Sequence, residues 1–107
     1  MMVITRGEFD RIIIKRGLFA FLNGESCKLC DRYMVSLKDF KDTKFYRNLS
    51  ILLLRDDDRQ WLFVDQQVLS TPLTRLYVDG LPVFQKGGIL FDSQIKEFEK
   101  KLLEYSA

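Results

Sequence analysis

Residues 18–30, which read LFAFLNGESCKLC, decide the fold of this 107-residue chain. The continuous apolar run 18–22 predicts a buried central strand, since a strand that is covered on both faces lacks polar alternation. A polar loop follows, and apolar side chains then recur at helical spacing from Cys30 to Phe40. Cys27 and Cys30, the two cysteines of the chain, therefore lie one helical turn apart at a strand-to-helix junction. That arrangement is typical of reversible disulfide chemistry.

A helix is predicted before this segment and a second strand after it. Thr5 and Glu8 form a capping-box pattern at the start of the first helix, and Gly17 can end it. Residues 41–48 read as a polar connection. The apolar run 49–54 then predicts a second buried strand.

Two further helices are predicted in the second half of the chain. The acidic run 56–58 fits a helix start, because carboxylates favour the exposed N–H groups there. The side chains on the inner face of that helix would be Trp61, Val64 and Val68. The last helix is predicted to be capped by Asp92 or Ser93. Its inward side chains would be Ile95, Phe98, Leu102 and Tyr105.

A hairpin is predicted between these two helices. Residues 74–78 and 81–85 have strand character on either side of Asp79-Gly80, a strong two-residue turn signal. Pro82 cannot donate to a strand ladder, so it places the second strand at the edge of the sheet. Parallel strands joined by helices, followed by this hairpin, predict a mixed four-stranded sheet with helices on both faces.

The bulk composition indicates one soluble globular domain covering residues 1–107. Seventeen basic and fifteen acidic residues leave a net charge of +2, which argues against nucleic acid or a membrane as a partner. The N-terminal residues lack the apolar core of a secretory signal, so we expect a cytoplasmic protein. In that compartment, a CxxC pair is redox-active or metal-binding more often than it is a structural staple.

Two other interpretations of the cysteines remain at this point. Cys27 and Cys30 could be small core residues, although Cys27 falls off the apolar stripe of its helix. Zinc would need two chains that share their CxxC pairs, because the sequence has no histidine and no further cysteine. The acidic run 56–58 could suggest a magnesium site, but a solvated helix start explains it more simply. We therefore expect no metal and no cofactor.

The order of elements resembles the thioredoxin family over nearly the whole chain. The CxxC pair opens the second helix, and Thr71-Pro72 precedes the hairpin at close to the usual thioredoxin separation. The segment 93–98 also resembles the last helix of thioredoxins. The resemblance implies a thioredoxin-like three-layer α/β/α sandwich, with a mixed, mainly four-stranded sheet and a C-terminal helix.

The same resemblance implies roles for the site residues. Cys27 would be the partly exposed nucleophile at the helix N-cap, where free N–H groups favour the thiolate, and Cys30 would resolve the mixed disulfide. Thr71 would offer backbone groups to an extended substrate, with Pro72 in cis beside the thiols. The substrate would also meet the residues between the cysteines, Lys28 and Leu29, and the glycine pair Gly87 and Gly88. That pair resembles glutaredoxins, although it reads more simply as a break in the chain than as a glutathione clamp.

Four positions depart from the thioredoxin pattern. Ser26 replaces the tryptophan before the first cysteine, Lys28-Leu29 replaces Gly-Pro, and Phe21 replaces a buried acid. The leading hypothesis is a thiol–disulfide oxidoreductase that exchanges disulfides with protein substrates, with thioredoxin reductase or glutathione as electron donor. The alternative is a non-catalytic thioredoxin-like module that docks a partner protein.

Overall fold

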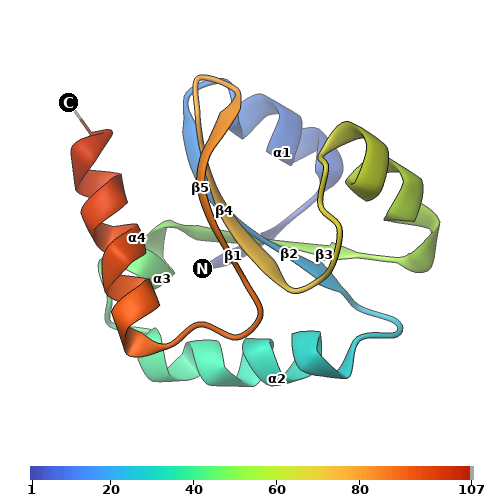
Figure 1. The fold of residues 1–107 in the computed structure, drawn as a ribbon, viewed down its shortest axis with the longest axis horizontal. Helices are drawn as coiled ribbons and strands as arrows, with labels where there is room; N and C mark the ends of the chain where they lie inside the picture. The colour runs from blue at the N-terminus through green and yellow to red at the C-terminus, as the bar shows by residue number, and fades with distance from the viewer. Residues whose placement is uncertain (107) are drawn as a thin grey trace.

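The computed structural model describes residues 1–106, which fold around a twisted five-stranded sheet (Figure 1). The strands are β1 (Met2–Ile4), β2 (Arg16–Asn23), β3 (Leu49–Leu54), β4 (Leu73–Val78) and β5 (Leu81–Gly87). Their order across the sheet is β1-β3-β2-β4-β5. β1, β3 and β2 are parallel, and β4 and β5 complete the sheet as an antiparallel hairpin. The predictions of a central strand at 18–22 and of an edge strand containing Pro82 are confirmed.

The predicted number of strands needs a correction, since the sheet has five strands and not four. The additional strand, β1, pairs in parallel with β3, with Met2 opposite Ser50 and Ile4 opposite Leu52. It is three residues long, and only Ile4 is buried. So short a segment, buried at one position, carries no periodicity that a sequence pattern can reveal.

Helices cover both faces of the sheet. The α-helices are α1 (Arg6–Ile12), α2 (Lys28–Ser36), α3 (Lys44–Asn48) and α4 (Asp92–Glu104), and the 3₁₀ turn η1 (Leu37–Phe40) extends α2. The predicted capping box of α1 is present, because Thr5 Oγ1 accepts from the Glu8 N–H and Glu8 Oε1 accepts from the Thr5 N–H. No helix within residues 1–106 is long and apolar enough to cross a membrane.

The segment predicted to form the third helix does not form an α-helix. The acidic run forms a 3₁₀ turn, η2 (Asp56–Asp58), and a short π-helical segment, η3 (Trp61–Asp65), follows it. The wider π turn buries Leu62 and leaves Val64 exposed, so Val64 is not on an inner face. The α-helical period assumed for this segment therefore assigned Val64 to the core in place of Leu62, whereas the predicted inward positions of Trp61 and Val68 are confirmed.

The other helix boundaries need smaller corrections. The segment 41–48, expected to be a plain connection, contains α3, whose Phe45 is fully buried. α4 begins at Asp92 itself, with Phe91 as its N-cap, because the Gln94 side chain accepts from the Phe91 N–H. Tyr105 follows α4 and is exposed, since the helix ends one residue before it.

The core lies in two layers, one on each face of the sheet. The first layer packs β2 and β4 against α2, α3 and α4, with Phe98 of α4 in edge contact with Phe84 of β5. The second layer packs the other face against α1 and η3. At its centre Phe9 makes edge-to-face contacts with Phe19, Phe21, Trp61 and Tyr77. The first layer holds α2 against the sheet and therefore determines at which end of the sheet Cys27 lies.

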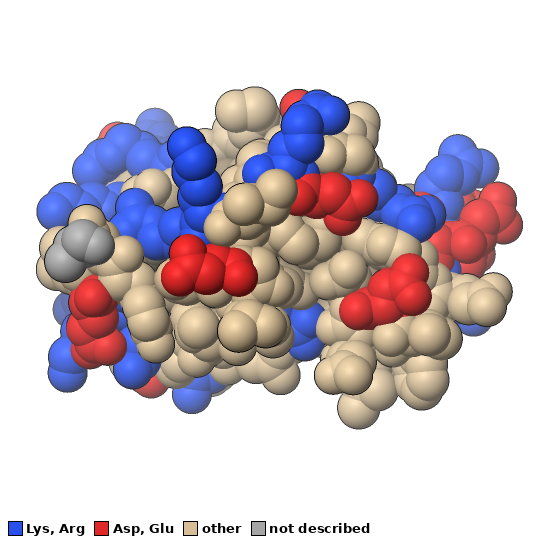
Figure 2. Space-filling model, turned by 90° about the horizontal axis from the view of Figure 1, so that it is seen from above, with Lys and Arg blue, Asp and Glu red and all other residues tan. Residues whose placement is uncertain are grey.

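Charges of both signs lie on the face that Figure 2 shows. Figure 2 shows Lys and Arg side chains alternating with Asp, Glu and uncharged surface when the molecule is seen from above. Seventeen basic and fifteen acidic residues are present in all. This view therefore shows no face dominated by one sign of charge.

One charged side chain lies inside the second core layer. Arg75 of β4 is 3% exposed and donates to the backbone oxygen of Gln66, the Tyr77 hydroxyl and the Gln85 side chain at 2.6–3.0 Å. All the acceptors that it meets in the described chain are neutral. Because the carbonyl of Gln66 lies directly after η3, Arg75 ties that segment to the hairpin.

We predict that Arg75→Leu lowers the free energy of unfolding by about 3 kcal/mol, since it leaves the buried Tyr77 hydroxyl and the half-buried Gln66 carbonyl without this donor. Urea denaturation measures the change. Arg11→Leu, at an exposed position of α1, is the control and should cost no more than about 0.5 kcal/mol. Equal losses in the two variants would contradict the structural role of Arg75.

Candidate functional site

The two cysteines form a disulfide at the start of α2. Cys27 is the N-cap of the helix, and its Cα lies 5.2 Å from that of Cys30. Cys27 is partly exposed, whereas Cys30 is 1% exposed and belongs to the first core layer. An attacking thiol can therefore reach the sulfur of Cys27 and is excluded from that of Cys30.

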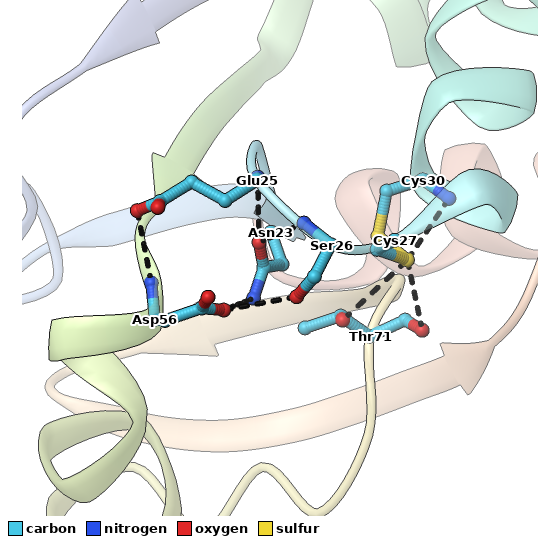
Figure 3. Close-up of a disulfide and its surroundings, with 7 residues drawn as sticks. All are labelled: Asn23, Glu25, Ser26, Cys27, Cys30, Asp56 and Thr71. Atoms are coloured by element: carbon cyan, nitrogen blue, oxygen red, sulfur yellow. Dashed lines mark hydrogen bonds between the residues drawn. A yellow bond between two sulfur atoms is a disulfide. The ribbon is translucent and has the colours of Figure 1, made fainter.

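The Sγ atom of Cys27 faces both α2 and the Thr71 loop (Figure 3). The Cys30 N–H donates to it at 3.1 Å, in the place where a serine or aspartate oxygen usually caps a helix. Thr71 Oγ1 lies 3.8 Å from the same sulfur, and the Thr71 carbonyl oxygen lies 3.7 Å from it. When the disulfide is reduced, this N–H and the positive end of α2 favour a thiolate at Cys27.

The Thr71-Pro72 and glycine segments meet beside the disulfide. The Thr71–Pro72 peptide bond is cis. The Gly88 N–H donates to the Pro72 carbonyl oxygen at 2.9 Å, and Gly87 pairs with Leu73 in the hairpin. Gly88 has φ +77°, a conformation that side chains disfavour, which accounts for glycine there. The structure thus brings Gly87 and Gly88 to the Pro72 end of the sheet.

Lys28 and Leu29 occupy the first turn of α2. Both side chains are exposed, and Leu29 is among the large apolar residues left on the surface. Neither side chain lines the cleft beside Cys27. They lie on the outer surface next to the disulfide.

A cleft of about 430 Å³ opens beside Cys27; we call it the Cys27 cleft. It lies between the 23–27 loop, the end of β3, η2–η3 and the Thr71 loop. Its lining residues are Asn23, Ser26, Cys27, Leu54, Arg55, Arg59, Leu62, Phe63, Val68, Leu69, Ser70 and Thr71. Of the site residues that the sequence indicated, Cys27 and Thr71 line it.

A polar network holds the loop before Cys27. Asp56 Oδ1 accepts from the Asn23 side chain and from the Ser26 hydroxyl, both at 2.9 Å (Figure 3). Asn23 Oδ1 in turn accepts from the backbone of Glu25 and Ser26. The hydrogen bonds from Asn23 and then from Ser26 lower the pKa of Asp56, so its carboxylate stays charged throughout the neutral range.

A second bridge joins the same two loops. Glu25 Oε1 accepts from the Asp56 N–H and pairs with Arg55 Nε, each at 3.1 Å. Asn23 ends β2 and Asp56 comes shortly after β3, and because these strands are parallel neighbours, the two side chains meet at one end of the sheet. Sequence reasoning missed this network because it assigned the acidic run to a helix start. Within residues 1–106, no group of three or more possible ligands is placed to hold a metal ion.

One hydrogen bond fixes α2 to the sheet behind the disulfide. The hydroxyls of Tyr33 on α2 and Thr74 on β4 lie 2.6 Å apart, and both residues are buried. Burial raises the pKa of Tyr33 to about 12, and the hydrogen bond to Thr74 offsets this only in part. The contact therefore consists of two neutral hydroxyls at all ordinary pH values.

The comparisons with known proteins find structural relatives alone. No protein-family model and no curated protein matches the sequence. The chain is similar in structure to thioredoxin f2 of Chlamydomonas reinhardtii, with a TM-score of 0.74, 12% identity and coverage of 94% of this chain and 95% of that one. It is also similar to thioredoxin of Plasmodium falciparum, with a TM-score of 0.64, 23% identity and coverage of 94% of this chain and 98% of that one. For Trxlp of Edwardsiella tarda the TM-score is 0.68 and the identity 17%, with coverage of 92% of this chain and 97% of that one. These similarities establish a shared fold.

We predict that Tyr33→Phe changes how stability depends on alkaline pH. The pKa of Tyr33 is raised on folding, so its contribution is complete below about pH 10 and is lost as the pH rises toward 12, by about 2–3 kcal/mol. At pH 7 the variant should be about 1–2 kcal/mol less stable than wild type, because Thr74 loses its partner. Urea denaturation from about pH 7 to 11.5 should show this gap closing. Parallel stability curves would contradict the assignment.

Proposed function

We propose that this chain, which has a thioredoxin-like fold, is a thiol–disulfide oxidoreductase that exchanges disulfides with protein substrates through Cys27 and Cys30. The observation that carries the proposal is the asymmetry of the pair. Cys27 is partly exposed at the N-cap of α2, and Cys30 is buried one turn behind it. That asymmetry separates an attacking sulfur from a resolving one.

The reduced protein would act in two steps. The Cys27 thiolate attacks one sulfur of the substrate disulfide, a mixed disulfide forms, and the other substrate sulfur leaves as a thiolate that takes a proton from water. The Cys30 thiol then gives up its proton and attacks Cys27 Sγ, which releases the second substrate thiol and forms the Cys27–Cys30 disulfide. Two electrons pass to the substrate, and the protein is oxidised by the same amount.

The surroundings of Cys27 supply the proposed substrate contacts. Thr71 and Pro72 would offer backbone groups to an extended substrate segment, and the adjoining Gly87-Gly88 pair leaves room for that segment. The side chains of Lys28 and Leu29 would contact the substrate from the first turn of α2, since both are exposed beside the disulfide.

The catalytic cycle needs a reductant to restore the dithiol. A thioredoxin reductase or glutathione would supply the two electrons, by the same exchange run in the opposite direction. We place this chemistry in the cytoplasm, where such reductants keep thiols reduced.

We predict that Cys27→Ser lowers turnover of a protein disulfide at least 100-fold, because it removes the attacking sulfur. Insulin reduction driven by dithiothreitol measures it, and the variant in which both cysteines are serine gives the background rate. In a separate reaction from which dithiothreitol has been removed, reduced Cys30→Ser should keep the first step and accumulate a covalent complex, which mass spectrometry detects as protein plus one substrate chain.

Turnover that survives Cys27→Ser would contradict the proposal. A wild-type protein without turnover, together with a bound partner whose affinity is the same in the double serine variant, would instead indicate a non-catalytic docking module.

A further inference from the structure

The charged side chains that line the Cys27 cleft are both basic. Its charged lining residues are Arg55 and Arg59, and no acidic side chain lines it. Cys27 is part of the same lining, so a group bonded to its sulfur would be held between this cleft and the Thr71 loop.

Both arginines keep free donors for a ligand. Arg55 pairs with Glu25 at 3.1 Å and Arg59 with Asp56 at 3.4 Å, and their side chains remain 74% and 71% exposed. A guanidinium has five N–H donors, so one such pair leaves most of them available. Neither acidic partner lines the cleft, although Asp56 also accepts hydrogen bonds from the lining residues Asn23 and Ser26.

Five apolar residues line part of the cleft, beside the polar side chains of the 23–27 and Thr71 loops. Leu54, Leu62 and Val68 are buried at its floor. Phe63 and Leu69 line it while remaining 59% and 79% exposed, although each is a large apolar residue. An apolar group that enters the cleft would remove these surfaces from water together with its own.

We propose that the Cys27 cleft selects protein disulfides whose reacting cysteine is flanked by an acidic residue and an apolar residue. The carboxylate would bind Arg55 and Arg59, and the apolar side chain would cover Phe63 and Leu69. A volume of about 430 Å³ has room for more than one side chain. A protein segment fits better than a small anionic thiol, because a small polar thiol would leave the apolar rim exposed. This inference rests on the proposed function.

The test uses short peptides that carry one cysteine as a mixed disulfide with 2-thiopyridine, an uncharged chromogenic leaving group. Three peptides share a leucine on one side of the cysteine and carry Glu, Gln or Lys on the other. Stopped-flow absorbance gives the rate constant for attack by reduced Cys27. We expect the Glu peptide to react at least threefold faster than the Gln peptide, and the Lys peptide to be slowest.

For each variant, the rate constants for two peptides are compared as a ratio. A loss of stability lowers both rate constants and leaves their ratio unchanged. In the double variant Arg55→Gln/Arg59→Gln the ratio of the Glu to the Gln rate should fall to about one. The control Arg11→Gln/Arg47→Gln removes the same two positive charges from exposed positions of α1 and α3, outside the cleft lining, and should keep the wild-type ratio. Arg59→Glu should reverse the order, so that the Lys peptide reacts faster than the Glu peptide.

Other outcomes overturn the inference. Equal rates for the three peptides would remove the selectivity while leaving the proposed function intact. The same fall in ratio with the control Arg11→Gln/Arg47→Gln would assign the effect to net charge. If the Arg55→Gln/Arg59→Gln variant reacted more slowly with glutathione disulfide but not with any of the peptides, the ligand of the cleft would be a small thiol and not a protein segment. No reaction with any peptide would defeat the proposed function and this inference together.

Discussion

The difference between the two cysteine sulfurs depends on the position of the first turn of α2 against the end of the sheet. The Tyr33–Thr74 hydrogen bond and the core contact of Cys30 hold the helix on β4, and this places Cys27 Sγ next to Thr71. The Cys30 N–H then points at the sulfur. A shift of the helix by one residue would bury Cys27 or expose Cys30, and the difference between the two sulfurs would vanish.

Two sets of residues near this turn hold the cysteines in place and shape the cleft. Asn23, Ser26 and Asp56 fix the loop before Cys27 through hydrogen bonds between the ends of β2 and β3. On the other side, Arg75 holds the backbone at Gln66, from which the chain runs to the Thr71 loop. Both supports are built from polar side chains attached to the sheet, Asn23 at the end of β2 and Arg75 within β4, so the cleft between them keeps a defined shape.

Much of the fold could be predicted from local patterns. The apolar run 18–22, the Asp79-Gly80 turn and the helical stripe after Cys30 each specify one element, and the thioredoxin-like fold that they indicate is the one observed. β1 escaped prediction because its burial depends on pairing with β3, and α3 because it is five residues long. The segment 56–65 was assigned the wrong helix because a π turn has a period that the apolar pattern does not reveal.

The part of the candidate site that lies within one short segment of the chain could be predicted. Cys27 and Cys30 are close in sequence, but Asp56 meets Ser26 only through the pairing of β2 with β3, which a single sequence does not display. The central claim is the difference between the two sulfurs, and iodoacetamide labelling of the reduced protein at neutral pH tests it most directly. We predict that peptide mass mapping finds Cys27 modified first and Cys30 only after unfolding. Equal rates at both cysteines, or faster labelling of Cys30, would contradict the account.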